Sequence, residues 1–212
     1  MLELRDHHLP PAGGDAMMSE ARDQSRRPAP ATQATLWTLG HSTLALDDFL
    51  ELLAGAGLQQ LADVRRFPGS RRHPHFNSEA LQQALAGRGI GYRHLPELGG
   101  RRGKPAPDSP NTGWRVAQFA AYADHMASAE FAAGMAALTE YARTAPTAVM
   151  CAEAVPWQCH RRLIADLLTV RGWQVLDLMP QGRVTPHRLT EFARVEGERL
   201  VYPPPQPGLP LE

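Results

Sequence analysis

The sequence predicts a single α/β domain in which a mainly parallel sheet of about five strands carries helices on both faces. Two observations support this fold class. Short apolar runs alternate with segments of helical periodicity, and glycines end several of those segments. The 212 residues, of which 43% are apolar, are enough for one sizeable core but few for two. We expect the domain to span residues 35–202.

The first third of that span contains two strand candidates and one helix. Residues 36–39 form a short apolar run that ends at Gly40, which is typical of a strand. Residues 46–56 place leucine and phenylalanine at helical spacing, and Gly57 follows as a stop signal. Residues 58–64 are the second predicted strand.

The middle of the chain alternates in the same way. Ser78 precedes a helical pattern that ends at Gly87 or Gly89, so we expect a capped helix there. Residues 90–95 predict a third strand. Residues 114–144 carry an apolar stripe at helical spacing, which predicts one or two helices.

The last third completes the predicted sheet. Residues 147–151 form a compact apolar run typical of a buried strand, residues 159–171 predict a helix ended by Gly172, and residues 173–179 predict the last strand. In a parallel sheet every strand-to-helix connection lies at the carboxyl edge. Open α/β folds place their sites at that edge.

Charge is balanced over the whole chain but not along it. The 22 basic and 22 acidic residues give a net charge of zero, which argues against a globally basic nucleic-acid binder. Residues 65–104, however, contain nine Lys or Arg and only two Glu. Arginines after strands, together with glycines, favour an anion site, because guanidinium groups and exposed backbone N–H groups both bind phosphate or carboxylate. A solvated loop paired with acids elsewhere is the alternative.

The candidate ligand-binding residues are polar side chains and glycines that follow the predicted strands. They are Gly40, Ser42, Asp63, Arg65, Ser70, Arg71, Gly99, Gly100, Arg101 and Arg161. We expect these residues to converge at the carboxyl edge of the sheet. The expected partner is an anionic ligand, such as a nucleotide or a nucleic acid.

The two cysteines are the candidate reactive groups. Cys151 follows a buried strand, and Cys159 precedes His160 at the predicted start of a helix, where a thiol pKa is lowered. With Glu153 and His41 these residues are the catalytic candidates. Cysteines that are small buried residues are the alternative. A metal site formed by Cys151, Cys159 and His160 is a further alternative, although the seven intervening residues differ from the short spacing of structural zinc sites.

The sequence also allows predictions about the cellular compartment and about the two ends of the chain. No apolar stretch is long enough for a membrane helix, and the first residues lack the apolar core of a secretory signal. Two cysteines do not make a disulfide framework, so we expect reduced thiols in the cytoplasm. Residues 1–34 and 203–212 predict a disordered N-terminal tail and a proline-rich C-terminal tail. The sequence indicates no particular cofactor.

Several runs together resemble the DUF488 family of bacterial and archaeal proteins. They are TLGHSTLALDDFLELL, LADVRRFPGSRRHPHFN, GIGYRHLPELGG, CAEAVPWQCHRRLIADLL and QGRVTPH, and they span about residues 36–192 in the family's order. The resemblance implies an α/β domain of unassigned activity. It also implies that the polar candidates share a site, since almost all of them fall in these runs. A fainter similarity to rhodanese-like domains rests on Asp63, Arg65 and Cys151, but Arg161 lies too far from Cys151 for a rhodanese active loop.

These observations lead to one main hypothesis and two alternatives. The main hypothesis is an enzyme that acts on a phosphate-bearing ligand, with arginines holding the anion and Cys151, Glu153 or His160 performing nucleophilic or acid–base work. The first alternative is a binding module without catalysis. The second is a metal-dependent or thiol-dependent protein that uses both cysteines and His160.

Overall fold

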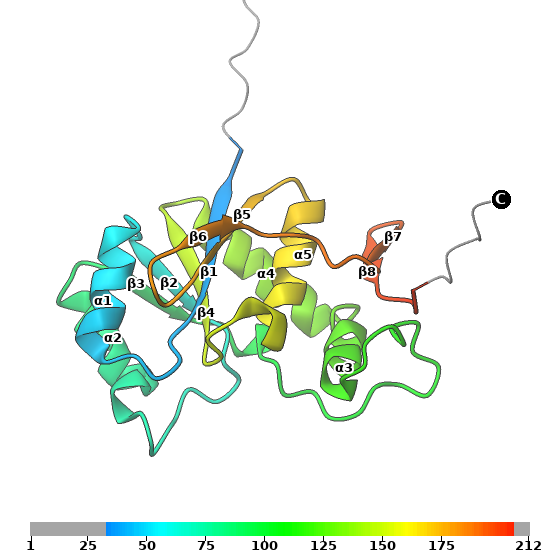
Figure 1. Cartoon of the computed structure of the whole chain (residues 1–212), viewed down its shortest axis with the longest axis horizontal. Helices are drawn as coiled ribbons and strands as arrows, with labels where there is room; N and C mark the ends of the chain where they lie inside the picture. Colours follow the sequence, from blue (N-terminus) through cyan, green and yellow to red (C-terminus); the bar gives the residue numbers. More distant parts are fainter. Residues whose placement is uncertain (1–32, 206–212) are drawn as a thin grey trace, which may run out of the picture. The chain divides into compact units, whose positions relative to one another are not determined.

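A computed structural model of the chain describes residues 33–205. Its main sheet has six strands in the order β3-β2-β4-β1-β5-β6 (Figure 1). All neighbouring pairs are parallel except β5 and β6, which are antiparallel. The strands are β1 (Thr35–Gly40), β2 (Gln60–Asp63), β3 (Gly91–His94), β4 (Thr147–Cys151), β5 (Gln174–Leu178) and β6 (Val184–Pro186).

Five α-helices connect and cover these strands. They are α1 (Leu46–Gly55), α2 (Ser78–Ala86), α3 (Ala117–His125), α4 (Ala129–Ala142) and α5 (Arg161–Val170). Three short 3-10 turns, η1 (Pro74–Phe76), η2 (Pro96–Leu98) and η3 (Pro156–Gln158), follow the ends of strands. A separate hairpin of β7 (Arg194–Glu196) and β8 (Arg199–Val201) comes last.

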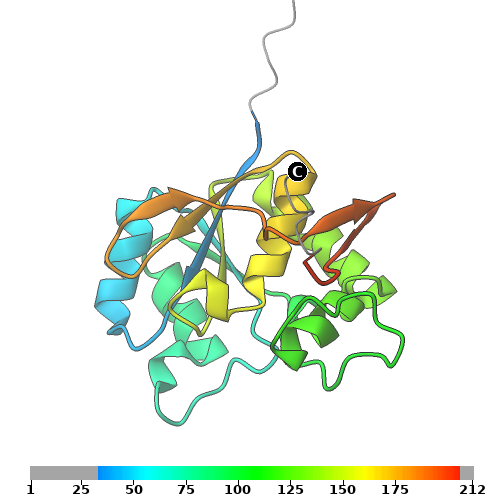
Figure 2. The same ribbon diagram turned by 45° about the vertical axis from the view of Figure 1, so that its right-hand side comes forward.

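Both faces of the sheet are buried, which explains the apolar strand runs. Figures 1 and 2 show α1 and α2 on one side of the strands and α3, α4 and α5 on the other. Alternate strand residues divide between two cores. Leu39 and Met150 pack with α1 and α2, whereas Leu36, Val149 and Cys151 pack with the other three helices. The predicted fold class, with helices on both faces, is confirmed.

Helix boundaries differ from the predicted ones for identifiable reasons. The segment 114–144 forms two helices, because Ser128 begins α4 by accepting a hydrogen bond from the Phe131 amide on its side-chain oxygen. The helix predicted to begin at Cys159 begins at Arg161, since Cys159 has extended backbone angles. This extended residue turns the Cys159 side chain toward the end of β4.

The antiparallel edge strand β6 was not predicted, because three residues are too few to give a periodic signal. A buried histidine fixes the chain just beyond it. His187 lies between two carboxylates, with Nε2 2.8 Å from Asp166 and Nδ1 3.1 Å from Asp177. Asp166 also accepts hydrogen bonds from Thr190 and from the Tyr202 hydroxyl. The network therefore ties β5, α5 and the C-terminal segment together.

The predicted tails fall mostly outside the described residues, so their disorder stays a prediction. Residues 33–34 and 203–205 have no regular secondary structure. Within residues 33–205 no helix has both the length and the apolar character needed to cross a membrane.

The His187 network predicts a specific loss of stability at alkaline pH. Burial opposes the imidazolium, but hydrogen bonds to Asp166 and Asp177 outweigh burial and raise the pKa of His187 to about 9. The folded pKa is thus higher than the unfolded one, so the stabilisation is complete below about pH 6.5 and is lost as pH rises through about 9. Chemical unfolding at pH 6 and pH 9.5 should show a loss on the order of 2 kcal/mol more in the native chain than in His187→Gln. Equal losses in both proteins would contradict this role.

Candidate functional site

A cleft of about 580 Å³ opens at the carboxyl edge of the sheet. Its walls come from the segments that follow β2 and β3 and from the connection between β4 and α5. The charged and reactive side chains that line it are Arg65, Arg66, Arg101, Arg102, Cys151, Glu153, Cys159 and His160. Residues far apart in the chain therefore meet at one place, as expected for the ends of parallel strands.

A cluster of two thiols and an imidazole lies on one wall of this cleft. The Nδ1 atom of His160 is 3.7 Å from the Cys151 sulfur and 3.6 Å from the Cys159 sulfur. Both cysteines are free and buried, with exposures of 4% and 1%. The Cys151 thiol also donates a hydrogen bond of 2.7 Å to Glu153. We call Cys151, Cys159 and His160 the thiol–imidazole cluster.

The orientation of His160 is fixed by the backbone on two sides. Its Nε2 atom lies 3.2 Å from the carbonyl oxygen of Val64, so this nitrogen carries the donated hydrogen and Nδ1 faces the sulfurs. Gly100 packs against the ring so closely that a Cβ at this position would collide with Nδ1. A glycine is therefore required here for steric reasons, because only a residue without a side chain leaves space for the imidazole ring.

Electrostatics make the two thiols unequal. A hydrogen bond with Cys159, together with burial, raises the pKa of Cys151 well above its ordinary value. Burial also opposes ionisation of Cys159, but the hydrogen bond from Cys151 and the charges of His160 and Arg161 lower its pKa. The pKa of His160 is raised, because the charge of Cys159 outweighs burial. The cluster thus favours a thiolate at Cys159 beside an imidazolium.

Arg161 holds the loop between β4 and η3. Its guanidinium is almost fully buried and donates hydrogen bonds to the carbonyl oxygens of Glu153, at 2.7 Å, and Ala154, at 3.0 Å. Gly40 lies under the same loop, where a Cβ would overlap the Glu153 carbonyl. These contacts position Cys151 and Glu153. They also mean that Arg161 is directed at the protein backbone and does not line the cleft.

Arg65, on the wall of the cleft, forms a buried ion pair with Asp63. Their closest atoms are 2.6 Å apart, and the Arg65 guanidinium also donates to the Phe76 carbonyl. The Tyr92 hydroxyl donates to the same carboxylate. His41 stacks on Phe76, and burial together with the charge of Arg65 lowers the His41 pKa to about 4. His41 is therefore neutral and belongs to this network, outside the thiol–imidazole cluster.

The other arginines of the cleft differ in how many hydrogen bonds and ion pairs hold their guanidinium groups. Arg102 is held by Glu130 and by carbonyl oxygens of the η2 turn, and Arg66 makes a longer contact with Glu130. Arg101 is exposed and has no ion-pair partner among residues 33–205. Among the predicted arginines, Arg101 is the one whose charge is available to a ligand in the cleft.

Four further predicted residues lie apart from the cleft lining. Ser70 and Arg71 belong to the loop before η1, where the Ser70 amide donates to Asn77 and its hydroxyl accepts from His73. The Ser42 amide donates to the Ala152 carbonyl, so Ser42 supports the β4 loop from behind. Gly99 permits close packing against the Arg66 backbone. These residues shape the surroundings of the site.

Several lining residues were not among the candidates. Arg66, Phe67, Arg102 and Gln158 line the cleft, and Phe67 is 67% exposed. Arg66 and Phe67 directly follow the predicted Asp63 and Arg65, so their place after a strand was the available signal. Gln118 and Phe119 also line the cleft but come from α3, and no local sequence signal places that helix at the edge.

Fold and site together define an α/β protein with a thiol–imidazole cluster in an arginine-lined cleft. Residues 45–168 match a family model described as "Domain of unknown function DUF488", and the chain belongs to this family. The matched span includes the thiol–imidazole cluster and every lining residue of the cleft. No curated protein and no solved structure matched the chain.

The contact between Gly100 and His160 predicts that Gly100→Ala disrupts the site. The added methyl group must displace the imidazole or the backbone, which typically costs about 1–3 kcal/mol in a packed region. Gly55→Ala is the matched control, because nothing lies within 4 Å of its added Cβ. Thermal unfolding of both variants checks this prediction. A Gly100→Ala protein as stable as the control would show that the packing is looser than described.

Proposed function

We propose that this chain is an enzyme that acts on a phosphate-bearing ligand in the arginine-lined cleft. The observation that supports the proposal is the position of the thiol–imidazole cluster on the wall of that cleft, beside Arg101. Four arginines line the cleft, and although Asp63 and Glu130 pair with three of them, Arg101 has no ion-pair partner among residues 33–205. A positive, partly enclosed surface favours an anion, and a nucleophile beside it can act on the bound molecule.

Each member of the site has a proposed role. Arg101, assisted by Arg66, binds the anionic part of the ligand. Glu153 lies where it can accept the Cys151 proton, and His160 exchanges protons with either thiol through Nδ1. A reducing compartment such as the cytoplasm would keep both thiols free, as they are in this structure.

A second candidate function, a metal-dependent enzyme, is favoured by the distances within the cluster. In a tetrahedral zinc site, sulfur and nitrogen ligands lie roughly 3.5–3.8 Å apart, given metal–ligand bonds of about 2.0–2.3 Å. The sulfur–nitrogen distances here are 3.7 and 3.6 Å, and all three ligand atoms lie within 4.8 Å of one another. The bond from His160 to the Val64 carbonyl is also typical of histidines that bind metal.

Separate variants should distinguish catalysis from binding alone. Cys151→Ser and Glu153→Gln should lower turnover of a phosphate-bearing substrate by about 10²–10⁴-fold while changing its affinity little. Arg101→Ala should instead weaken binding. A screen of nucleotides and oligonucleotides, followed by turnover and binding measurements, checks both expectations. Arg199→Ala, an exposed change in β8, is the control.

The same variants expose the opposite outcome. If Arg101→Ala weakens binding but no ligand is turned over by the native chain, a binding module without catalysis is the correct interpretation.

Elemental analysis separates the thiol and metal candidates. If the cluster binds metal, the protein purified without chelator should carry about one zinc ion per chain, and Cys159→Ser should lose it. If the cluster is a free thiol site, native protein should carry no stoichiometric metal and should titrate as two thiols with a disulfide reagent after mild unfolding.

A further inference from the structure

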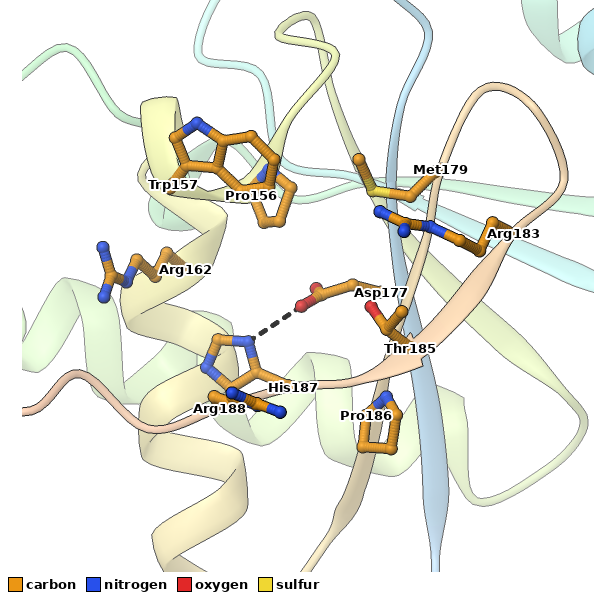
Figure 3. A pocket seen from close by; sticks show the side chains of 10 residues that line it. All are labelled: Pro156, Trp157, Arg162, Asp177, Met179, Arg183, Thr185, Pro186, His187 and Arg188. Carbon is orange, nitrogen blue, oxygen red and sulfur yellow. Dashed lines mark hydrogen bonds and ion pairs between the residues drawn. The ribbon is translucent and has the colours of Figure 1, made fainter.

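A second cavity of about 580 Å³ lies on the other side of η3 from the cleft. Pro156 and Trp157 of η3 line this second cavity, whereas Gln158 of the same turn lines the cleft. The η3 turn is therefore a narrow ridge between two hollows. We call the second hollow the β6 cavity, because its far wall is formed by the ends of β5 and β6 (Figure 3).

Trp157 places a large, exposed aromatic ring on this ridge. Its side chain is 54% exposed, although burial of an indole usually stabilises a protein. Figure 3 shows the ring at one rim of the β6 cavity and the guanidinium of Arg183 extending toward it from the opposite wall. A flat aromatic face opposite a cation fits a ligand that is itself flat and anionic.

The charge of the β6 cavity is strongly positive. Arg162, Arg183 and Arg188 line it, and no carboxylate within residues 33–205 forms an ion pair with any of them. The carboxylate of Asp177, which also lines it, is already bound by His187 and by the Thr38 hydroxyl. Arg162 leans over the Trp114 ring, at 5.5 Å, so Arg183 and Arg188 are the exposed cations.

The cleft on the other side of the ridge offers the same combination of groups. Phe67 is 67% exposed there, and Arg101 is exposed without an ion-pair partner among residues 33–205. Exposed aromatic rings and unpaired arginines thus recur on both sides of η3. A single-stranded nucleic acid repeats the complementary groups, since each unit carries one flat base and one phosphate.

The geometry points to a single-stranded nucleic acid as the ligand class, with one stretch in the cleft and a neighbouring nucleotide in the β6 cavity. The base stacks on Trp157, and its phosphates contact Arg183 and Arg188. This inference rests on the proposed function, because it extends the ligand of the cleft across the η3 ridge. The bases of a duplex are paired and stacked on one another, so they cannot stack on Trp157 unless the strands separate. Single-stranded binding should therefore exceed duplex binding.

Fluorescence anisotropy with labelled oligonucleotides of about 15 nucleotides tests the inference. The probes are single-stranded DNA, single-stranded RNA and duplex DNA. The native chain should bind a single-stranded probe most tightly, and its affinity should fall as salt concentration rises. Trp157→Ala and the double change Arg183→Ala with Arg188→Ala should each weaken binding roughly tenfold or more. The matched controls, Val195→Ala and Arg199→Ala, alter exposed residues that line neither hollow and should bind as the native chain does.

A mononucleotide competitor separates this inference from the proposed function. The β6-cavity variants should keep the native affinity for the mononucleotide in the cleft, whereas Arg101→Ala should lose it. Native-like oligonucleotide binding by Trp157→Ala and by the double arginine variant would overturn the inference. So would a native chain that binds the mononucleotide but no oligonucleotide, and in that case the proposed function would stand. If neither probe binds, both the inference and a nucleotide ligand for the cleft are rejected.

Discussion

The site depends on one buried guanidinium. Arg161 donates to the carbonyl oxygens of Glu153 and Ala154, and these bonds set the path of the chain between β4 and η3. A buried cation is costly unless its hydrogen bonds and charge are compensated. The backbone carbonyls bond the two terminal nitrogens, the buried Nε has no hydrogen-bond partner among residues 33–205, and the lowered pKa of Cys159 favours an anion nearby. One residue thus couples the shape of the loop to the ionisation of the thiol–imidazole cluster.

Much of the fold could be predicted because buried helices and strands place apolar residues in the sequence at characteristic spacings. The run at residues 147–151 is buried at every position and apolar at all but Thr147, since β4 lies in the middle of the sheet and is covered on both faces. Strand β6 has only three residues, too few to show such a pattern, and its place is fixed by pairing with β5 and by His187 just beyond it. Short segments held by long-range polar contacts are where periodicity fails.

The candidate site was predicted by position more successfully than by role. Cys151, Glu153 and His160 follow the same strand or precede the same helix, so topology alone brings them near one another. The roles of the arginines could not be read in this way, because a sequence shows a charge but not its partner. Arg65 pairs with Asp63, and Arg161 with backbone, while Arg66 and Phe67 were missed although they stand beside predicted residues.

The unpredicted strand β6 also has a consequence for association between chains. It occupies one edge of the sheet, and exposed edges can pair with strands of other molecules. Pro186 has no amide hydrogen, and only two other residues belong to the strand. An incoming strand would find too few donors to continue the hydrogen-bond ladder. A short, proline-containing edge of this kind therefore discourages aggregation on that side of the sheet.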